Sequence, residues 1–319
     1  MTEQVLPPPQ PPLWSSVGQL SGHSAAIYAL AAGEVPLSLY SADGNGWVVY
    51  WADLLRNEGL ALAQLPSSVF SLYPLNTSRL LAAGTMQGIL YGIDLDRKHK
   101  LQTLQLGGAV LSLAEWQENL LAACGNGHLY VIKPDTWQIL YTLSISGKAI
   151  RQIALQPQQT LAALACSDGQ IYLLDIDNWT IRQTLSFHTQ SVFSICFSPD
   201  GQYLLSGGRD AQMAIWQANP TDPFLWTLCH VIPAHLSTIN HITYSPRQPY
   251  FATASRDKSF KIWHSEQFVL QKVLSPDKPH IAAHRHSVNR LLWLPDSDYL
   301  VSGGDDKQLL IGQLLPRPQ

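Results

Sequence analysis

Charged residues are scarce in this 319-residue chain: Asp, Glu, Lys and Arg make up 13% of it, whereas about a quarter is usual for a soluble protein. The 23 acidic residues slightly outnumber the 20 basic ones, so the formal net charge is −3. A surface that binds nucleic acid through its phosphates needs clustered Lys and Arg. The charge balance therefore excludes a general nucleic-acid footprint, although it is compatible with a local basic patch.

Long apolar segments are also missing. No apolar stretch approaches the roughly 18 residues that are needed to span a bilayer. The N-terminus begins Met-Thr-Glu and continues into the proline-rich segment Pro7–Pro12, interrupted only by Gln10. Such a start lacks the charged region and the apolar core of a secretory signal peptide. We therefore expect a cytoplasmic protein that has no membrane partner.

Motifs for cofactors, metals and disulfide frameworks are absent as well. No phosphate-binding loop, dinucleotide-binding fingerprint or paired-cysteine motif occurs. The cysteines Cys124, Cys166, Cys196 and Cys229 stand at strand-like positions without metal-ligand spacing. They could form two disulfides, but buried free thiols are the favoured interpretation. The sequence predicts neither a cofactor nor a resident metal.

What the chain does contain is one pattern repeated seven times. A β-rich run ends in a small residue, an acid or amide follows, and a second β-rich run begins. The positions after the acid or amide are Gly46, Gly88, Gly127, Gly169, Ala211, Lys258 and Lys307, at spacings of 42, 39, 42, 42, 47 and 49. A period near forty residues indicates supersecondary units that cannot bury their apolar faces alone. The sequence therefore predicts a single array of seven packed units.

Each unit reads as four strands, and the fifth unit shows them most clearly. Ser191–Phe197 alternates between apolar and polar residues, and a second strand follows the turn at Gln202–Ser206. Further strands are predicted at Met213–Trp216 and around Leu225–Val231. Several of the turns between the second and third strands are Asn-Gly or Asp-Gly pairs, which tolerate the positive φ of a tight hairpin.

A combination of polar residues recurs at constant offsets within these units. His188, Ser206, Asp210 and Trp216 in the fifth unit correspond to His235, Thr253, Asp257 and Trp263 in the sixth. The 22-residue gap from His to Asp also separates His284 from Asp306, and His23 from Asn45. Over residues 14–315 this pattern resembles the WD40-repeat β-propellers. In that family a His lies in the connection from strand d to strand a, Ser or Thr ends strand b, Asp lies in the b–c turn, and Trp lies in strand c.

The resemblance implies an all-β, seven-bladed propeller with four-stranded antiparallel blades. It also implies a buried polar network, for which we predict His23, Ser41, Trp51, His188, Ser206, Asp210, Trp216, His235, Thr253, Asp257, Trp263, His284, Ser302 and Asp306. Blade one departs from the pattern with Asn45 in place of the acid, and blade seven with Gly312 where Trp would lie. Blades two, three and four have Leu65, Leu106 and Ser146 near the His position. We expect these three blades to depend on apolar packing.

The end of the chain leaves blade seven incomplete. After Gln308–Gln313 only six residues remain, too few for an outer strand. An array that leaves its two ends unjoined would expose strand edges. We therefore predict that Leu13–Leu20 supplies the outer strand of blade seven. The expected organisation is a proline-rich lead at 1–12, one propeller at 13–315 and a short tail at 316–319.

Two histidine patterns raise the question of catalysis or metal binding. Several units combine Ser or Thr with His and Asp, which superficially resembles a hydrolase triad. A nucleophile has no reason to be repeated around a ring, so a structural role is favoured. The densest cluster comprises Asp277, His280, His284 and His286, where a solvated insertion is favoured over a metal site. The protein is predicted not to be an enzyme.

The resemblance also implies a binding face, where strand a begins and the b–c turn reaches the rim. The predicted binding residues there are Tyr28, Phe70, Met86, Leu111, Arg151, Phe193, Arg209, Asn240, Arg256, Asn289 and Asp305. Tyr28, Phe70, Met86 and Leu111 are expected to form an apolar arc opposite Arg151, Arg209 and Arg256. Aromatic and Arg residues dominate interface energetics, and arginines bind carboxylate or phosphate bidentately. The arginines could equally pair with nearby acids or stay solvated.

These observations favour a non-catalytic scaffold that binds a protein or peptide, with acidic and phosphorylated partners among the candidates. The protein is expected to be monomeric alone or a subunit of a larger assembly. Two alternatives remain open at this point. One is an enzyme with its site at the mouth of a central channel, and the other is weak, salt-dependent nucleic-acid binding through the arginine side.

Overall fold

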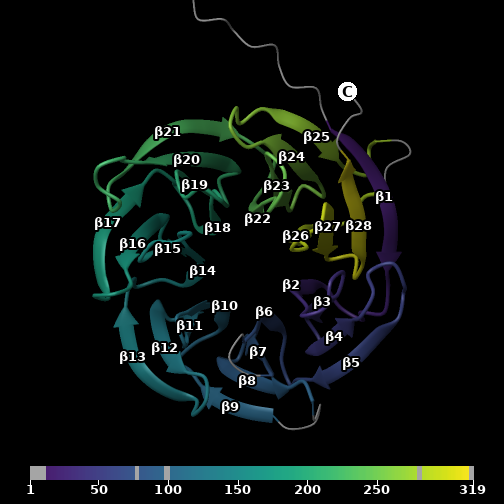
Figure 1. Ribbon diagram of the computed structural model, residues 1–319, viewed down its shortest axis with the longest axis horizontal. Coiled ribbons are helices and arrows are strands. Elements are labelled where there is room, and N and C mark those ends of the chain that lie inside the picture. Colours follow the sequence, from purple (N-terminus) through teal and green to yellow (C-terminus); the bar gives the residue numbers. More distant parts are fainter. Residues whose placement is uncertain (1–11, 76–78, 97–100, 279–281, 316–319) are drawn as a thin grey trace, which may run out of the picture.

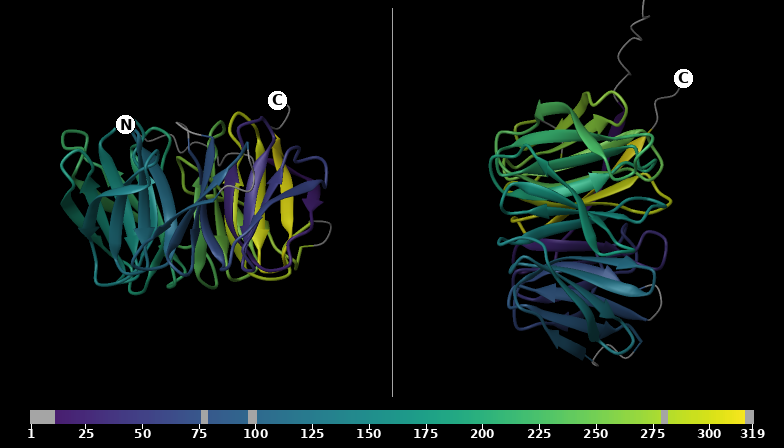
Figure 2. Two further views of the ribbon diagram at one scale, coloured as in Figure 1. Left: turned by 90° about the horizontal axis from the view of Figure 1, so that it is seen from below. Right: turned by 90° about the vertical axis from the view of Figure 1, so that its left-hand side faces the viewer.

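The computed structural model of the protein describes residues 12–75, 79–96, 101–278 and 282–315. These residues form seven four-stranded antiparallel sheets and no helix. The sheets stand around a central channel like the blades of a propeller (Figure 1), and the side views show a thick disc (Figure 2). The predicted all-β, seven-bladed architecture is therefore confirmed.

Each blade runs from strand a beside the channel to strand d at the outside (Figure 1). Blade one comprises β2 (Ile27–Ala32), β3 (Leu39–Asp43), β4 (Trp47–Trp51) and β5 (Gly59–Gln64). Blade two comprises β6 (Val69–Pro74), β7 (Leu80–Thr85), β8 (Ile89–Asp94) and β9 (Leu101–Gln105). Blade three comprises β10 (Val110–Trp116), β11 (Asn119–Cys124), β12 (His128–Lys133) and β13 (Gln138–Ser144).

The remaining blades continue in the same order. Blade four comprises β14 (Ile150–Leu155), β15 (Leu161–Cys166), β16 (Gln170–Asp175) and β17 (Thr180–Ser186). Blade five comprises β18 (Val192–Phe197), β19 (Tyr203–Gly208), β20 (Gln212–Ala218) and β21 (Trp226–Pro233). Blade six comprises β22 (Ile239–Tyr244), β23 (Tyr250–Ser255), β24 (Phe260–His264) and β25 (Leu270–Leu274). Blade seven contains β26 (Val288–Trp293), β27 (Tyr299–Gly304) and β28 (Leu309–Leu315).

The N-terminal strand closes the ring, as predicted. β1 (Leu13–Leu20) pairs antiparallel with β28, from Leu13 opposite Leu315 to Leu20 opposite Leu309. It is therefore strand d of blade seven, in a sheet of order β1-β28-β27-β26. The predicted proline-rich lead, except Pro12, and the predicted tail at 316–319 lie outside the described residues.

The repeat-defining positions share one backbone conformation. φ is positive at all seven of them, namely Gly46, Gly88, Gly127, Gly169, Ala211, Lys258 and Lys307. At Gly46 a side chain is also excluded sterically, because a Cβ there would lie 2.0 Å from the carbonyl oxygen of Leu65. The periodicity read from the sequence is thus the periodicity of tight b–c hairpins.

The apolar core is divided among the interfaces between blades. Each hydrophobic cluster combines side chains from two neighbouring sheets. Between blades five and six, for example, Leu205 and Ile215 pack in one cluster with Ile239 and Phe251. Burial of apolar surface is the main favourable contribution to folding, so every blade depends on both neighbours. Loss of any one blade would expose the two interfaces that this blade forms with its neighbours.

Candidate functional site

One residue of every strand a is displaced by a β-bulge at the mouth of the channel. The pairing of strands a and b shifts register around the second residue of strand a in each blade. A bulge adds one residue to one strand and re-aims a side chain. The displaced residues are Tyr28, Phe70, Leu111, Arg151, Phe193, Asn240 and Asn289.

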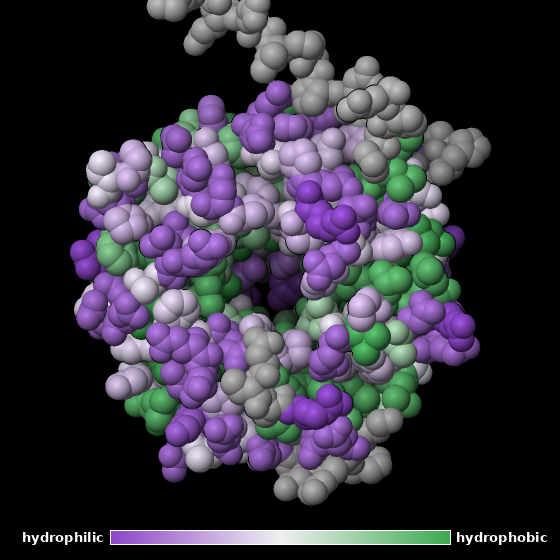
Figure 3. Space-filling model, viewed as in Figure 1, coloured by the Kyte–Doolittle hydropathy of each residue, from purple (hydrophilic) through white to green (hydrophobic). Residues whose placement is uncertain are grey.

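These seven side chains come together in one cavity. With Met86 and Arg290 they line a space of about 240 Å³ at one end of the channel. Figure 3 shows the channel itself as the hollow at the centre of the ring. The rings of Tyr28 and Phe70 lie 5.0 Å apart, and Met86 is 56% exposed. The structure therefore brings eight of the predicted binding residues to the same site.

Arg151 packs against an aromatic side chain of the next blade. Its guanidinium lies 4.8 Å from the centre of the Phe193 ring, and its Nε donates a hydrogen bond of 2.7 Å to the Ser167 hydroxyl. Burial lowers the pKa of Arg151. A cation over an aromatic face is attracted by the ring quadrupole, which explains why Arg151 takes part in the apolar wall.

The other predicted rim residues lie outside the cavity lining. Arg209, Arg256 and Asp305 are exposed and sit in the b–c turns of blades five, six and seven. The backbone N–H of Arg209 donates to Ser191 at 2.9 Å, and that of Arg256 to Thr238 at 3.0 Å. Asp305 accepts a hydrogen bond of 2.7 Å from the Asn289 amide. These three residues therefore belong to the rim around the cavity.

Arg290 is a site residue that the sequence interpretation missed. It follows the bulged residue Asn289 on β26. Because successive side chains of a strand point to opposite faces, a regular strand would direct Arg290 away from the cavity that Asn289 lines. The bulge between Val288 and Arg290 adds a residue to the strand, and the cavity is lined by both Asn289 and Arg290. Only the bulge, which no residue pattern announced, could have identified it.

The Arg290 guanidinium is bonded to backbone carbonyls. Its Nε donates to the carbonyl oxygen of Tyr28 at 2.8 Å, and an Nη2 hydrogen to that of Phe70 at 3.3 Å. Burial lowers its pKa to about 10, so it stays protonated at neutral pH. Among the described residues, no carboxylate forms an ion pair with Arg290 or Arg151.

A second, more polar cavity lies deeper in the channel beneath Arg290. It measures about 150 Å³, and its lining includes Ser71, Ser112, Gln152, His241 and Arg290. Burial, together with repulsion from Arg290, lowers the pKa of His241 to about 3. The imidazole is therefore neutral at physiological pH, and Arg290 carries the positive charge of this part of the channel.

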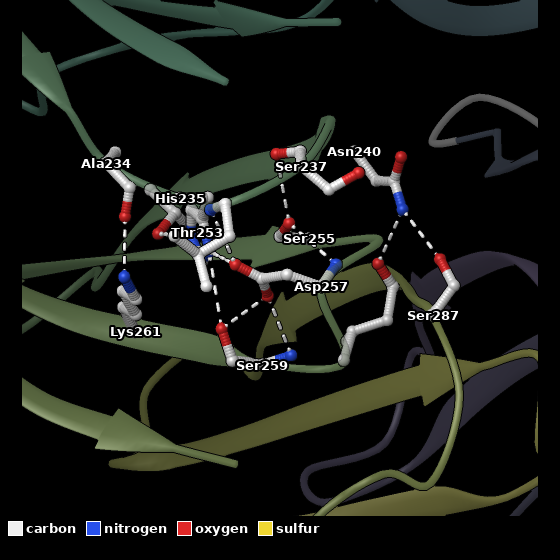
Figure 4. A network of polar contacts seen from close by, with 12 residues as sticks. Ala234, His235, Ser237, Asn240, Thr253, Ser255, Asp257, Ser259, Lys261 and Ser287 are labelled. Carbon is white, nitrogen blue, oxygen red and sulfur yellow. Dashed lines mark hydrogen bonds and ion pairs between the residues drawn. The ribbon is translucent and has the colours of Figure 1, made fainter. Parts of the chain in front are cut away.

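The buried polar network is seen most completely in blade six (Figure 4). His235 bonds through Nδ1 to Asp257 at 2.9 Å and through Nε2 to the Thr253 hydroxyl at 2.8 Å. The Trp263 indole N–H donates to the same hydroxyl at 2.9 Å. Burial would raise the pKa of Asp257, but its hydrogen bonds with His235, Ser259 and the Leu236 N–H lower it on balance. The carboxylate thus joins the b–c turn to the d–a connection, and His235 continues the network to strands b and c through Thr253.

The same connection is present in three other blades. In blade five His188 bonds to Asp210 and Ser206, and the Trp216 indole N–H donates to the Ser206 hydroxyl. In blade seven His284 bonds to Asp306 and Ser302. In blade one His23 contacts Ser41, with Trp51 on the serine. The predicted members of the network in these four blades therefore do lie in hydrogen-bonded groups.

The acid of blade one was missed, and Asn45 is not its substitute. His23 Nδ1 bonds to Asp43 at 3.0 Å, whereas the Asn45 amide points to the Ser24 hydroxyl. Asp43 ends strand b, at the register position that Gly208 holds in blade five. From there its carboxylate also accepts the Asn45 and Trp47 N–H groups. The blade therefore replaces a turn acid with a strand acid two residues earlier.

Two family models match the chain. The model described as "WD domain, G-beta repeat" matches residues 179–217, 226–264 and 276–311, and the model described as "Anaphase-promoting complex subunit 4 WD40 domain" matches residues 114–193. The chain belongs to the WD40-repeat family. No curated protein is similar enough to be matched to it. WD40 propellers commonly serve as protein-interaction scaffolds and are typically non-catalytic.

The matches of the repeat model fall on WD40 blades five, six and seven, and blades two and three lack the His of the network. Leu65 and Leu106 are buried near the His positions of the following blades, as expected for apolar packing. Blade four was wrongly expected to lack a polar connection. There the Ser146 hydroxyl donates to Asp168 at 2.6 Å, and the Tyr172 hydroxyl to the same carboxylate at 2.9 Å.

The triad-like combinations lie inside the WD40 blades. Ser206 and Thr253 are fully buried, so no substrate reaches their hydroxyls, and each accepts a hydrogen bond from a Trp indole. All four cysteines are free thiols. Within the described ranges no group of three His, Cys, Asp or Glu residues is arranged to hold a metal ion. No helix that could cross a membrane occurs in the described part of the chain.

Loss of the blade-six carboxylate should destabilise this WD40 propeller. Asp257→Ala leaves His235 and the turn N–H groups without their acceptor, at an expected cost of about 1–3 kcal/mol in the free energy of unfolding. The matched control is Gln87→Ala in the b–c turn of blade two, because Gln87 is exposed and should cost clearly less. Urea or thermal unfolding of both variants measures the difference. The reverse ranking would show that the network does not stabilise its blade.

Proposed function

We propose that the protein is a non-catalytic scaffold that captures a protein or peptide partner at the cavity on its channel mouth. The observation that carries this proposal is the convergence of seven bulged residues, one from each blade, on a single cavity. Three aromatic rings, a methionine and two arginines in one depression match the composition of interface anchor sites. The cavity of about 240 Å³ is smaller than the roughly 300–1,000 Å³ of ordinary small-molecule pockets. That size suits one or two side chains of a partner.

The rim supports the same proposal. Arg209 and Arg256 are exposed in neighbouring b–c turns, where they can steer and contact an acidic or phosphorylated partner. Leu236, in the connection that precedes β22, is 94% exposed, and its N–H is held by Asp257. The sequence interpretation did not select Leu236, because apolar residues in loops carry no signal of exposure. Together these residues extend the contact area beyond the cavity.

Similarity over residues 114–193 to a domain named as part of an anaphase-promoting complex subunit favours a role as one subunit of a larger cytoplasmic assembly. That similarity concerns the domain and does not identify the assembly. The mode of action is then the usual one of a rigid ring that presents a preformed surface, with little cost in conformational entropy on binding.

Affinity purification of partners with surface variants tests the proposed site. Phe70→Ala should weaken capture by removing an apolar anchor, in low and in high salt. Arg209→Glu combined with Arg256→Glu should weaken it by charge reversal, and high salt should reproduce only this second effect.

The control must be a charge reversal away from the cavity. Arg182 on β17 is unsuitable, because it lies 4.3 Å from the centre of the Phe224 ring and pairs with Asp175. Arg56 is better matched, because its side chain is 71% exposed and its ion pair with Asp53 lies at the surface, where such a pair contributes little. Arg56→Glu should leave capture unchanged. Partners that bind the folded Phe70→Ala and double-arginine variants as tightly as wild type would refute the proposed site.

A further inference from the structure

The cavity contains a positive charge that the protein itself does not neutralise. Arg290 is bonded to the carbonyl oxygens of Tyr28 and Phe70, which are dipoles without net charge. His241, which lines the deeper cavity with Arg290, is held neutral by burial and by Arg290 itself. Burying a charge is costly unless it is paired. A ligand anion that pairs with Arg290 would therefore offset the cost of burying the guanidinium without a counter-charge.

The guanidinium has donors left for such an anion. An arginine carries five N–H groups, and two of those on Arg290 are engaged with the carbonyls. The unused hydrogens on Nη1 and Nη2 form the edge that binds a carboxylate bidentately. Arg151 lines the same cavity and also lacks a carboxylate partner among the described residues. Asp305, an acid on the rim, is engaged by Asn289.

We infer that the cavity receives a carboxylate of a bound peptide on Arg290, with an adjacent apolar side chain of the peptide against Tyr28, Phe70 and Leu111. This inference rests on the proposed function and names the group that the site selects. A carboxylate carries one negative charge, whereas a phosphoryl group carries about −1.5 to −2. Because much of the wall is aromatic and aliphatic, the monoanion is the less costly group to bury. The carboxylate can belong to the end of a chain or to an Asp or Glu side chain.

The test uses fluorescein-labelled hexapeptide pools and fluorescence anisotropy with the 319-residue protein. One pool ends in Leu with a free carboxylate, and its control ends in Leu amide. A second, amidated pool contains an internal Glu-Leu pair, and its control contains Gln-Leu. A fifth, amidated pool contains phosphoserine-Leu. We expect at least one carboxylate pool to bind about tenfold or more tightly than its neutral control, and the pool that does so identifies the source of the carboxylate.

Variants assign the preference to Arg290. Arg290→Gln should abolish the difference between carboxylate and neutral pools, and Arg290→Lys should retain part of it, because a lysine keeps the charge but loses the bidentate edge. Phe70→Ala should weaken both members of each pair equally. If Arg290→Gln does not fold, the comparison of carboxylate and neutral pools on the wild-type protein still tests whether the cavity prefers a carboxylate.

Three outcomes would overturn the inference: equal binding of carboxylate and neutral pools, tightest binding of the phosphoserine pool, or no binding of any pool to wild type. Partner capture that remains sensitive to Phe70→Ala would, in each of these cases, leave the proposed function standing. Loss of that sensitivity would remove the proposed function as well.

Discussion

Deletion of residues 1–20 is expected to prevent the protein from accumulating as a soluble monomer, or to lower its melting temperature by at least about 10 °C. The deletion removes β1, the strand d of blade seven. It would leave β28 with a free row of N–H and C=O groups, and such an edge recruits other chains. It would also uncover Ile311 and Leu314, which are buried in the ring.

The comparison variant for this experiment lacks only residues 1–11, which precede the described part of the chain, and therefore retains β1. We expect it to melt within a few degrees of the 319-residue protein. Size-exclusion chromatography and thermal melts of both truncations provide the measurement. Equal stability of the two proteins would mean that β1 does not close the propeller.

Substitution of Gly312 by alanine is expected to destabilise the protein by about 3 kcal/mol, a large effect for one added methyl group. Gly312 lies on β28, and a Cβ built there would be 1.8 Å from Cζ2 of Trp14. The Trp14 ring is held by Phe260, at 5.6 Å between ring centres, so it cannot simply withdraw. The control on the neighbouring strand is Gly18→Ala. A Cβ at Gly18 would lie 3.9 Å from Ile311 Cδ1, so this substitution should change the free energy of unfolding little.

A second pair of variants shows whether Trp14 occupies the place of a missing tryptophan. Gly312 pairs with Leu300 as Trp216 pairs with Leu204 in blade five. Trp14→Ala alone should cost about 3–5 kcal/mol. Combining it with Gly312→Trp should recover part of that loss, because the new indole can reach the Ser302 hydroxyl as Trp216 reaches Ser206. Urea unfolding measures the coupling. If the double variant loses as much stability as the two single variants together, Trp14 does not occupy the place of the missing tryptophan.

Residue patterns were sufficient for those parts of the protein that depend on local conformation. Positive φ recurs in the b–c turns, and glycine, which adopts it most readily, occupies four of the seven positions. The seven hairpins are therefore visible as a period near forty residues. The His–Asp contacts of blades five, six and seven follow from a constant offset, because identical hairpins repeat the same geometry. Closure by Leu13–Leu20 followed from counting strands, since a ring with an unpaired edge is unfavourable.

Residue patterns did not identify the contacts that depend on a shift of one residue in strand register. Asp43 rather than Asn45 meets His23, Trp14 fills the space over Gly312, and Arg290 turns into the cavity. A bulge is a one-residue shift between two paired strands, and a one-residue shift changes the face on which a side chain lies. Residue patterns predicted the seven-bladed ring and most of the residues at its mouth. Packing between strands distant in sequence decided which polar side chains meet there, because hydrogen-bond partners depend on distances that no spacing along one chain specifies.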